Sequence, residues 1–392
     1  MTLEENINRG IAVLRSIQKT GRVIAGDDGV TVEVDVAEVP APIEPTPPAA
    51  AVPLIAMTGQ SQMLYLLDGA DQGTEAVAPQ FPYATVYGGF NPPAYTIDAV
   101  LRENDHSEGL NAFVNAYSEA VNITGYAKGA TPIAEWQTST RPAYVELKAV
   151  LDQVGQFTDF IFMQGTHDGH SGGLNGNGAA YKQAFKDFET QLRLDFPHAF
   201  TMHIVPLGRV LDLVQSKAYN IRMAHYELTQ ELDNCALAPI GADIEQEDAY
   251  HQTKKGNIRL GARLAHYLKT GNAGAKILHV QHPANTDVLM ITFDKQLING
   301  ATGLPENLSI HINGTTTDVA IGAVAVDGQT LTVQLLDPYP QGGIAVRPYY
   351  GVTQNGNTDI GMENTLRDND IVAGDIMGMP IAMQPTVISV VV

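Results

Sequence analysis

Short apolar runs alternate with amphipathic stripes between residue 52 and about residue 270. The apolar runs predict buried strands at Pro53–Met57, Ala120–Thr124, Asp159–Met163, Phe200–Val205 and Cys235–Ile240. Helical spacing predicts two helices, one through Tyr181, Phe185, Phe188 and Leu192 and one through Ile258, Gly261, Ala265 and Leu268. Buried strands separated by helices are typical of a parallel sheet covered on both faces, so we expect a three-layer α/β/α sandwich over residues 52–273.

The pattern changes on both sides of this region. Residues 274–392 carry short β-rich runs between Gly, Asn, Asp and Pro turns, which predict a C-terminal β-sandwich with jelly-roll-like strand spacing. Residues 1–51 read as a small N-terminal appendage, with a helix over 7–17, a hairpin over 22–36 and a Pro-rich linker over 40–48. Because a lone helix and hairpin bury little surface, we expect this appendage to dock on the main body, on a second copy of the chain or on an attachment partner.

Charge and cysteine content narrow the function classes. The 392 residues carry a formal net charge of -20, which argues against nucleic acid and anionic membrane surfaces as partners. The single cysteine, Cys235, lies in an apolar run and is expected to be a buried structural thiol. No run is long and apolar enough to span a bilayer, and the N-terminus lacks the features of a secretory signal. We therefore expect cytoplasmic synthesis. Any role outside the cell would depend on delivery on a virion or cell surface.

Four polar segments follow strand candidates or precede the last helix. They are Thr58-Gly-Gln-Ser61-Gln-Met63, Ala127-Lys-Gly129, Gln164-Gly-Thr-His-Asp168 and Asp248-Ala-Tyr-His251. A serine at a strand-to-helix turn can act as a nucleophile when a base takes its proton, and an Asp three residues before a His can orient that base. Taken alone, each segment has an ordinary explanation as a turn or a helix cap. Together they predict one reactive edge of the sheet.

The ordered set of segments resembles the SGNH hydrolases, in the branch of the sialate O-acetylesterases and carbohydrate acetyl esterases. In that branch the first block reads Gly-Gln-Ser-Asn before Met, and the second resembles Gly-Gly-Thr-Pro-Ile before a Trp. Here these blocks stand as Gly59-Gln-Ser61-Gln-Met63 and Lys128-Gly129-Ala-Thr131-Pro-Ile133-Ala-Glu-Trp136. The third block, Gln-Gly-Glu-x-Asp, departs from the pattern because Thr166 replaces its Glu, and Gln62 replaces the Asn of the first. The resemblance covers residues 52–270.

The resemblance implies a serine esterase with an SGNH-type fold. It makes Ser61 the nucleophile, His251 the general base and Asp248 the residue that orients the base. It forms the oxyanion hole from the backbone N–H groups of Ser61 and Gly129 and the side-chain amide of Gln164. Further residues expected near the substrate are Gln60, Gln62, His167, Asp168 and Tyr250.

The implied substrate is an acetylated glycan, and the reaction needs no metal or organic cofactor. His167, Asp168 and His170 lie close in sequence but lack further ligands at zinc-like spacing, so we expect no metal site there. Two alternatives stay open. One is a non-catalytic carbohydrate-binding or virion attachment protein on the same fold, and the other is a lipase or thioesterase.

Overall fold

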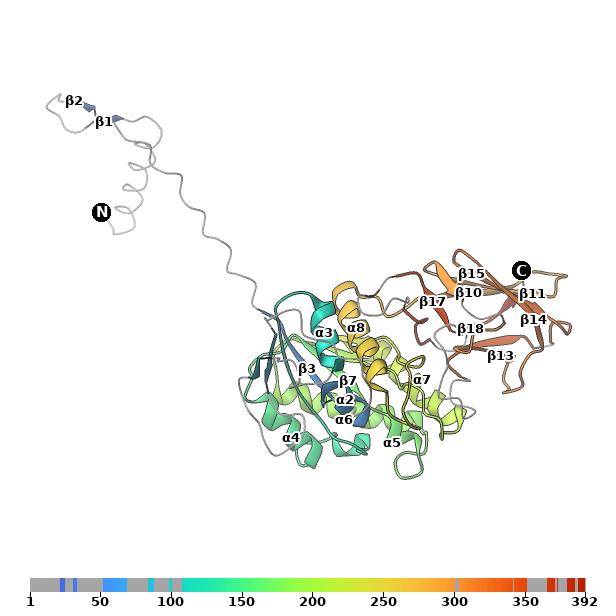
Figure 1. Ribbon diagram of the computed structural model, residues 1–392, viewed down its shortest axis with the longest axis horizontal. Coiled ribbons are helices and arrows are strands. Elements are labelled where there is room, and N and C mark those ends of the chain that lie inside the picture. The colour runs from blue at the N-terminus through green and yellow to red at the C-terminus, as the bar shows by residue number, and fades with distance from the viewer. Residues whose placement is uncertain are drawn as a thin grey trace, which may run out of the picture. The chain divides into compact units, whose positions relative to one another are not determined.

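The computed structural model describes twelve stretches of the chain (Figure 1). They are residues 22–24, 31–33, 52–68, 84–87, 99–100, 108–299, 303–340, 342–350, 365–370, 372, 379–384 and 387–391. The chain forms two compact units, Met1–Ala51 and Val52–Val392. In the first unit, β1 (Arg22–Ile24) pairs antiparallel with β2 (Thr31–Glu33), and these are the two arms of the predicted hairpin. The helix expected over 7–17 and the linker over 40–48 lie outside the described residues.

A seven-stranded sheet forms the centre of the second unit, in the order β5-β4-β6-β3-β7-β8-β9. Its strands are β3 (Leu54–Gly59), β4 (Ala84–Tyr87), β5 (Ala99–Val100), β6 (Val121–Ala127), β7 (Asp159–Met163), β8 (Thr201–Ile204) and β9 (Cys235–Leu237). All neighbours pair in parallel except β5, which runs antiparallel to β4 at one edge. The parallel sheet predicted from the apolar runs is therefore confirmed, with β3 near its middle.

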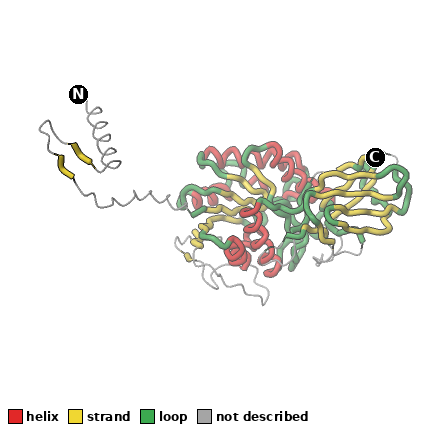
Figure 2. Tube along the Cα trace, turned by 90° about the horizontal axis from the view of Figure 1, so that it is seen from above, coloured by secondary structure: helices red, strands yellow, loops and turns green. Residues whose placement is uncertain are grey.

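Helices cover both faces of this sheet, as Figure 2 shows. One layer consists of α2 (Ser61–Asp68), α3 (Glu108–Tyr117) and α8 (Lys254–Thr270), and the other of α4 (Pro142–Leu151), α6 (Gly178–Asp195) and α7 (Gln215–Glu231). Alternate residues of β3 face the two layers. Ile55 and Met57 join the core with α2, α3 and α8, whereas Leu54 and Ala56 join the core with α4, α6 and α7. This confirms the three-layer α/β/α sandwich.

The predicted strands of the central sheet match the structure to within three residues at each end. The largest shortfall is β9, which ends at Leu237 rather than at Ile240. Ala238 N–H still donates to Ile204 O at 2.8 Å, and the next residue, Pro239, has no N–H with which to continue the ladder. Burial raises the pKa of the Cys235 thiol to about 12. This side chain is half-buried at the sheet edge, where a protonated thiol is inert.

The region after residue 274 is built from antiparallel sheets, consistent with the predicted β-sandwich. The larger sheet contains β14 (Ile321–Asp327), β15 (Thr330–Leu335), β11 (Val288–Phe293), β10 (Ile277–His282) and β19 (Val390–Val391), and only the β10–β19 pair is parallel. In one smaller sheet, β16 (Ile344–Pro348) lies between β13 (Leu308–Ile312) and β18 (Val387–Ile388). In the other, β12 (Leu297–Asn299) pairs with β17 (Leu366–Asp368). The shared core of these sheets also takes in Tyr219 of α7 and Ile240 after β9, so the sandwich and the α/β region bury apolar surface against each other.

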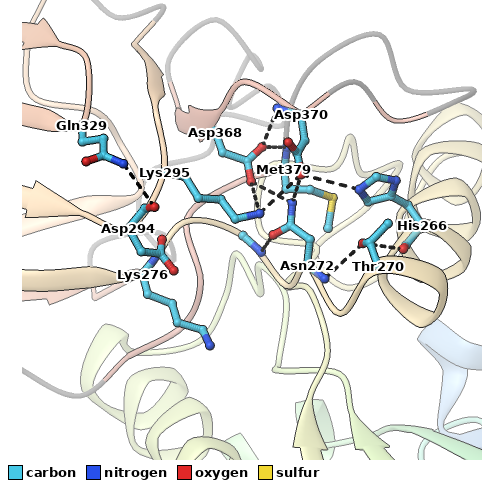
Figure 3. A network of polar contacts seen from close by, with 11 residues as sticks. His266, Thr270, Asn272, Lys276, Asp294, Lys295, Gln329, Asp368, Asp370 and Met379 are labelled. Atoms are coloured by element: carbon cyan, nitrogen blue, oxygen red, sulfur yellow. Dashed lines mark hydrogen bonds and ion pairs between the residues drawn. The ribbon is translucent and has the colours of Figure 1, made fainter.

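A polar network fixes the C-terminal end of α8 to the sandwich (Figure 3). The amide Nδ2 of Asn272 donates to Asp368 Oδ2 at 3.0 Å and also to Asp370. Lys295 Nζ lies 3.6 Å from the Asp368 carboxylate and 3.3 Å from that of Asp370, and His266 of α8 lies 3.8 Å from Asp370. Burial raises the pKa of the Asp368 carboxyl. Helix α8 starts three residues after His251. The network therefore links the C-terminal end of this helix to residues about 100 positions later in the chain.

Within the described ranges, no helix combines the length and apolar character needed to cross a bilayer.

Candidate active site

Ser61 lies where β3 gives way to α2, as its first helical residue. The preceding Gly59 has φ +150°, and a Cβ at this position would lie 2.0 Å from the carbonyl oxygen of Met163. A glycine is therefore required for the tight exit from the sheet. The first N–H groups of a helix have no acceptor within the helix, so the start of α2 favours a developing negative charge beside Ser61.

The segments that follow β6 and β7 reach the same edge of the sheet. Gly59 is in register with Ala127 of β6 on one side and Met163 of β7 on the other. Gly129 lies two residues beyond Ala127, and a Cβ built on it would lie 3.9 Å from the Cβ of Ser61, with no other neighbour within 4 Å. The structure thus brings Gly129 beside Ser61, with open space around the glycine.

His251 is held by Asp248 three residues earlier in the loop before α8. Its Nδ1 lies 2.7 Å from Asp248 Oδ2, and its backbone N–H donates to Asp248 Oδ1 at 2.8 Å. Because a carboxylate accepts hydrogen bonds only, the imidazole carries its proton on Nδ1 and leaves Nε2 free to accept one. This is the tautomer that a general base requires.

Two contacts tie the His251 loop to the helix that carries Ser61. The ring of Tyr65 stacks on the ring of His251, with centroids 4.4 Å apart and planes 8° from parallel. The side-chain amide of Gln62 donates to the carbonyl oxygen of Tyr250 at 3.0 Å. Ser61 and Tyr65 are four residues apart and share one face of α2, so the imidazole lies over the helix face that bears the serine.

Hydrogen bonds keep the Asp248 carboxyl ionised. Burial alone would raise its pKa, but bonds from the His251 side chain and from the backbone N–H groups of Tyr250 and His251 lower it below its ordinary value. The side chain is 47% exposed, so water also solvates the charge. An ionised Asp248 can therefore stabilise the imidazolium that forms when His251 takes a proton.

Replacing Asp248 with Asn should lower kcat for p-nitrophenyl acetate about 100-fold with little change in KM, because the amide stabilises neither the tautomer nor the imidazolium. We expect a smaller loss than for a fully buried triad acid because Asp248 is half exposed. Steady-state kinetics would measure both constants. Asp212→Asn is the matched control, since this nearby exposed carboxylate accepts from Tyr250 and should cost less than about tenfold. Full activity in Asp248→Asn would contradict the assigned role.

Gln164 and Asp168 belong to a buried polar cluster under the site. The Gln164 amide Nε2 donates to Asp168 Oδ2 at 2.5 Å. The other acceptors of this nitrogen are Thr131 O at 3.1 Å and Gln60 Oε1 at 3.2 Å. Asp168 also accepts from the backbone N–H of Ile133 at 2.9 Å and is fully buried, and burial raises the pKa of its carboxyl. This buried position differs from the expected contact with substrate: Oδ2 accepts both bonds, and Oδ1 is buried with no hydrogen-bond partner among the described residues.

The two glutamines that flank Ser61 are also buried. Gln60 is 2% exposed and its Oε1 accepts from Gln164, whereas Gln62 is 3% exposed and bonds to the His251 loop. In this structure they flank Ser61 and contact the cluster under the site and the loop of His251, which also differs from the expected contact with substrate. The residue types in the blocks did not reveal this difference, because a buried and an exposed glutamine look alike in a sequence.

A neutral histidine supports the Gln164 cluster from below. Burial, with a contribution from Arg222, lowers the pKa of His225 to about 3. Leu207 N–H donates to His225 Nδ1 at 3.2 Å, so the ring proton lies on Nε2, 3.0 Å from the Tyr181 hydroxyl. Tyr181 in turn donates to Gln164 Oε1 at 2.7 Å. This chain of bonds fixes which end of the Gln164 amide faces Asp168.

Tyr250 connects His251 to further partly exposed side chains. Tyr250 lies beside it with ring centroids 6.0 Å apart, and its hydroxyl donates to Asp212. His170 Nε2 lies 3.5 Å from the same Asp212 carboxylate, and His167 is half-buried in the short helix α5 (Thr166–Gly169). Among the described residues, no group of three or more His, Cys, Asp or Glu side chains is arranged to hold a metal ion.

Sequence reasoning did not include Tyr65 or Asp212 in the site. Tyr65 could have been found from its spacing, because it follows Ser61 by four residues on a helix that was expected there. Asp212 lies in a loop before α7 and meets Tyr250 only through the fold. No pattern in the sequence signals that contact.

Comparisons with known proteins agree with this fold. The sequence model of the family described as carbohydrate esterase, sialic acid-specific acetylesterase, matches residues 107–270. A solved carbohydrate acetylesterase from Xanthomonas citri is similar with a TM-score of 0.59 and 15% identity, covering 84% of this chain and 79% of that chain. A search of the curated proteins found no match.

Two further solved structures each cover 56% of this chain. A carbohydrate acetylesterase from Sinorhizobium meliloti has a TM-score of 0.38 and 13% identity, covering 56% of this chain and 100% of that chain. An aryl esterase from M. smegmatis has a TM-score of 0.38 and 11% identity, over 56% of this chain and 99% of that chain.

Proposed function

We propose that the chain is a carboxylic ester hydrolase of the SGNH carbohydrate esterase branch, a serine esterase that removes acetyl groups from a carbohydrate. Ser61 is the nucleophile, His251 is the general base and Asp248 orients the base. The proposal rests above all on the stacking of His251 on Tyr65, one helical turn beyond Ser61.

The reaction proceeds through an acyl-enzyme in two balanced steps. Ser61 Oγ attacks the ester carbonyl carbon while its proton passes to His251 Nε2, and the same proton then leaves with the sugar hydroxyl. In the second step, water gives a proton to His251 Nε2 and attacks the acyl carbon. Acetic acid departs, and the proton returns to Ser61.

The negative charge of each tetrahedral intermediate develops on the former carbonyl oxygen. The backbone N–H groups of Ser61, at the start of α2, and of Gly129, beside it, donate to that oxygen. The Gln164 amide has its donors directed at Asp168, Thr131 and Gln60, so direct donation from Gln164 requires one of these bonds to break. The two backbone groups are therefore the main donors in this proposal.

The proposed substrate is an acetylated glycan, with Tyr250 and His167 as contacts from partly exposed positions. The name of the matched family and the Xanthomonas citri protein's description as a carbohydrate acetylesterase support this substrate class. The chemistry needs no metal or organic cofactor. A carbohydrate-binding protein without turnover is the second candidate, favoured by the β-sandwich beside the α/β region.

A chain-length series tests the short-acyl specificity. With p-nitrophenyl esters from C2 to C12, kcat/KM should be highest for acetate and fall steeply beyond about four carbons. Strong turnover of C8 or longer esters would instead identify a lipase or thioesterase. Acetate release from acetylated glycans, measured by mass spectrometry, should accompany the C2 activity, and no hydrolysis of any ester would favour the carbohydrate-binding candidate.

A further inference from the structure

We propose that Tyr65 is a positioning residue whose ring stabilises the protonated form of His251 during turnover. This inference rests on the proposed function, because it assigns to His251 a proton that comes from Ser61. It concerns a side chain outside the four sequence blocks, held over the base by the helix that bears the nucleophile.

The geometry is that of a face-to-face stack. The planes of the Tyr65 and His251 rings differ by 8° and their centroids lie 4.4 Å apart. Both side chains are half-buried, so water only partly screens the contact. The flat overlap fixes the plane of the imidazole, while Asp248 at Nδ1 fixes its rotation within that plane.

The charged and titratable groups around His251 come from its own loop, from α2 and, through Tyr250, from the segments that carry Asp212 and His170. In its own loop, Glu247 donates its backbone N–H to the His251 carbonyl oxygen at 3.0 Å. Asp248 and Tyr250 lie in its own loop, with the Asp248 carboxylate at Nδ1 and the Tyr250 ring tilted by 67°. Tyr65 approaches from α2, next to the Ser61 hydroxyl one turn away. Asp212, from the loop before α7, reaches this group only through the Tyr250 hydroxyl.

The imidazole becomes a cation when it takes the Ser61 proton. A cation over the face of an aromatic ring is attracted by the ring's electrons, whereas a neutral imidazole gains less from the same contact. The stack therefore stabilises the protonated state that accompanies the tetrahedral intermediate. An attraction of this kind corresponds to about three- to tenfold in rate and to about half to one pH unit in the protonation midpoint.

The test is a graded series at position 65. Tyr65→Leu should lower the plateau of kcat about three- to tenfold and move the acidic limb of kcat/KM to lower pH by about half a unit or more. Tyr65→Phe should restore both values because it keeps the ring. Tyr65→Trp should move the limb toward higher pH if the wider ring fits, since indole binds cations best.

A matched control comes from the β-sandwich. Tyr339 stacks on His282 with centroids 3.9 Å apart, so Tyr339→Leu removes the same kind of contact away from the site. It should leave both the plateau and the limb unchanged. Thermal melting of each variant would show whether the fold is retained.

A loss of packing alone would lower the plateau of Tyr65→Leu without moving the limb, and that result would overturn the proposal. An unchanged plateau and an unchanged limb in Tyr65→Leu would also overturn the proposal. If the wild type hydrolyses no ester, the proposed function fails separately. NMR titration of His251 in wild type and Tyr65→Phe would then still test the ring, because their midpoints should agree while that of Tyr65→Leu lies lower.

Discussion

Ser61→Ala should lower kcat for p-nitrophenyl acetate by at least about 10⁴-fold, leaving only the residual rate that oxyanion donors and binding can supply. The reason is chemical, because Ser61 supplies the hydroxyl at the start of α2, one turn before the tyrosine that stacks on His251. KM should change little, since the serine contributes mainly to the covalent step. Burst kinetics and mass spectrometry of an acyl adduct on the wild type would accompany the comparison.

The control for this variant is Ser216→Ala. Ser216 also lies in the first turn of a helix, α7, but it is exposed. The Ser216→Ala variant should keep full activity. Both variants should melt near the wild-type temperature because alanine is a good helix former. Substantial hydrolysis by Ser61→Ala would mean that another group is the nucleophile.

Asp243→Asn should destabilise the protein by about 3–5 kcal/mol, because it leaves buried guanidinium groups without their full counter-charge. Asp243 is fully buried and accepts from Arg263 at 2.6 and 2.8 Å and from Arg259 at 3.1 Å. Burial alone would raise the pKa of the Asp243 carboxyl, but the two arginines hold it well below its ordinary value. Both arginines belong to α8, the helix that follows the loop of Asp248 and His251.

Chemical denaturation at pH 7 would measure the loss. Asp152→Asn is the control, since its ion pair with Lys148 is exposed and should contribute less than about 1 kcal/mol. A depressed pKa contributes stability above the unfolded value of about 4 and loses it as pH falls, so the difference between wild type and Asp243→Asn should shrink below about pH 4. A variant as stable as the wild type at pH 7 would show that the cluster has relaxed.

The centre of the sheet could be predicted because its strands are buried on both faces. In β3 every residue from Leu54 to Gly59 is buried, and β7 is apolar from Phe160 to Met163, so each strand appears in the sequence as a continuous apolar run. The two outer strands on one side of the sheet, β4 and β5, give no comparable signal. They are short, at four and two residues, and lie between segments rich in Gly and Pro.

The roles within the site were harder to predict than its location. Strand order places Ser61, Gly129 and Gln164 at one sheet edge, and parallel topology is enough to expect that. Whether Gln164 and Asp168 face the substrate or the interior depends on bonds to Tyr181 and Ile133, which are distant in sequence. The Tyr65–His251 stack likewise depends on how closely the loop that carries His251 approaches α2.

The attachment of α8 to the sandwich has a consequence for how this enzyme can be divided. Arg222 of α7 is fully buried and donates to the carbonyl oxygen of Tyr349 at 2.6 Å, and Asn272 at the end of α8 is held by Asp368. A cut near residue 274 would remove the Tyr349 acceptor from that guanidinium, leaving it the Leu207 and Gly208 carbonyl oxygens, and would release the end of the helix that begins after His251. The C-terminal sheets therefore support the α/β region at α8, and exchanging them for another module would mean rebuilding the support of the helix that follows His251.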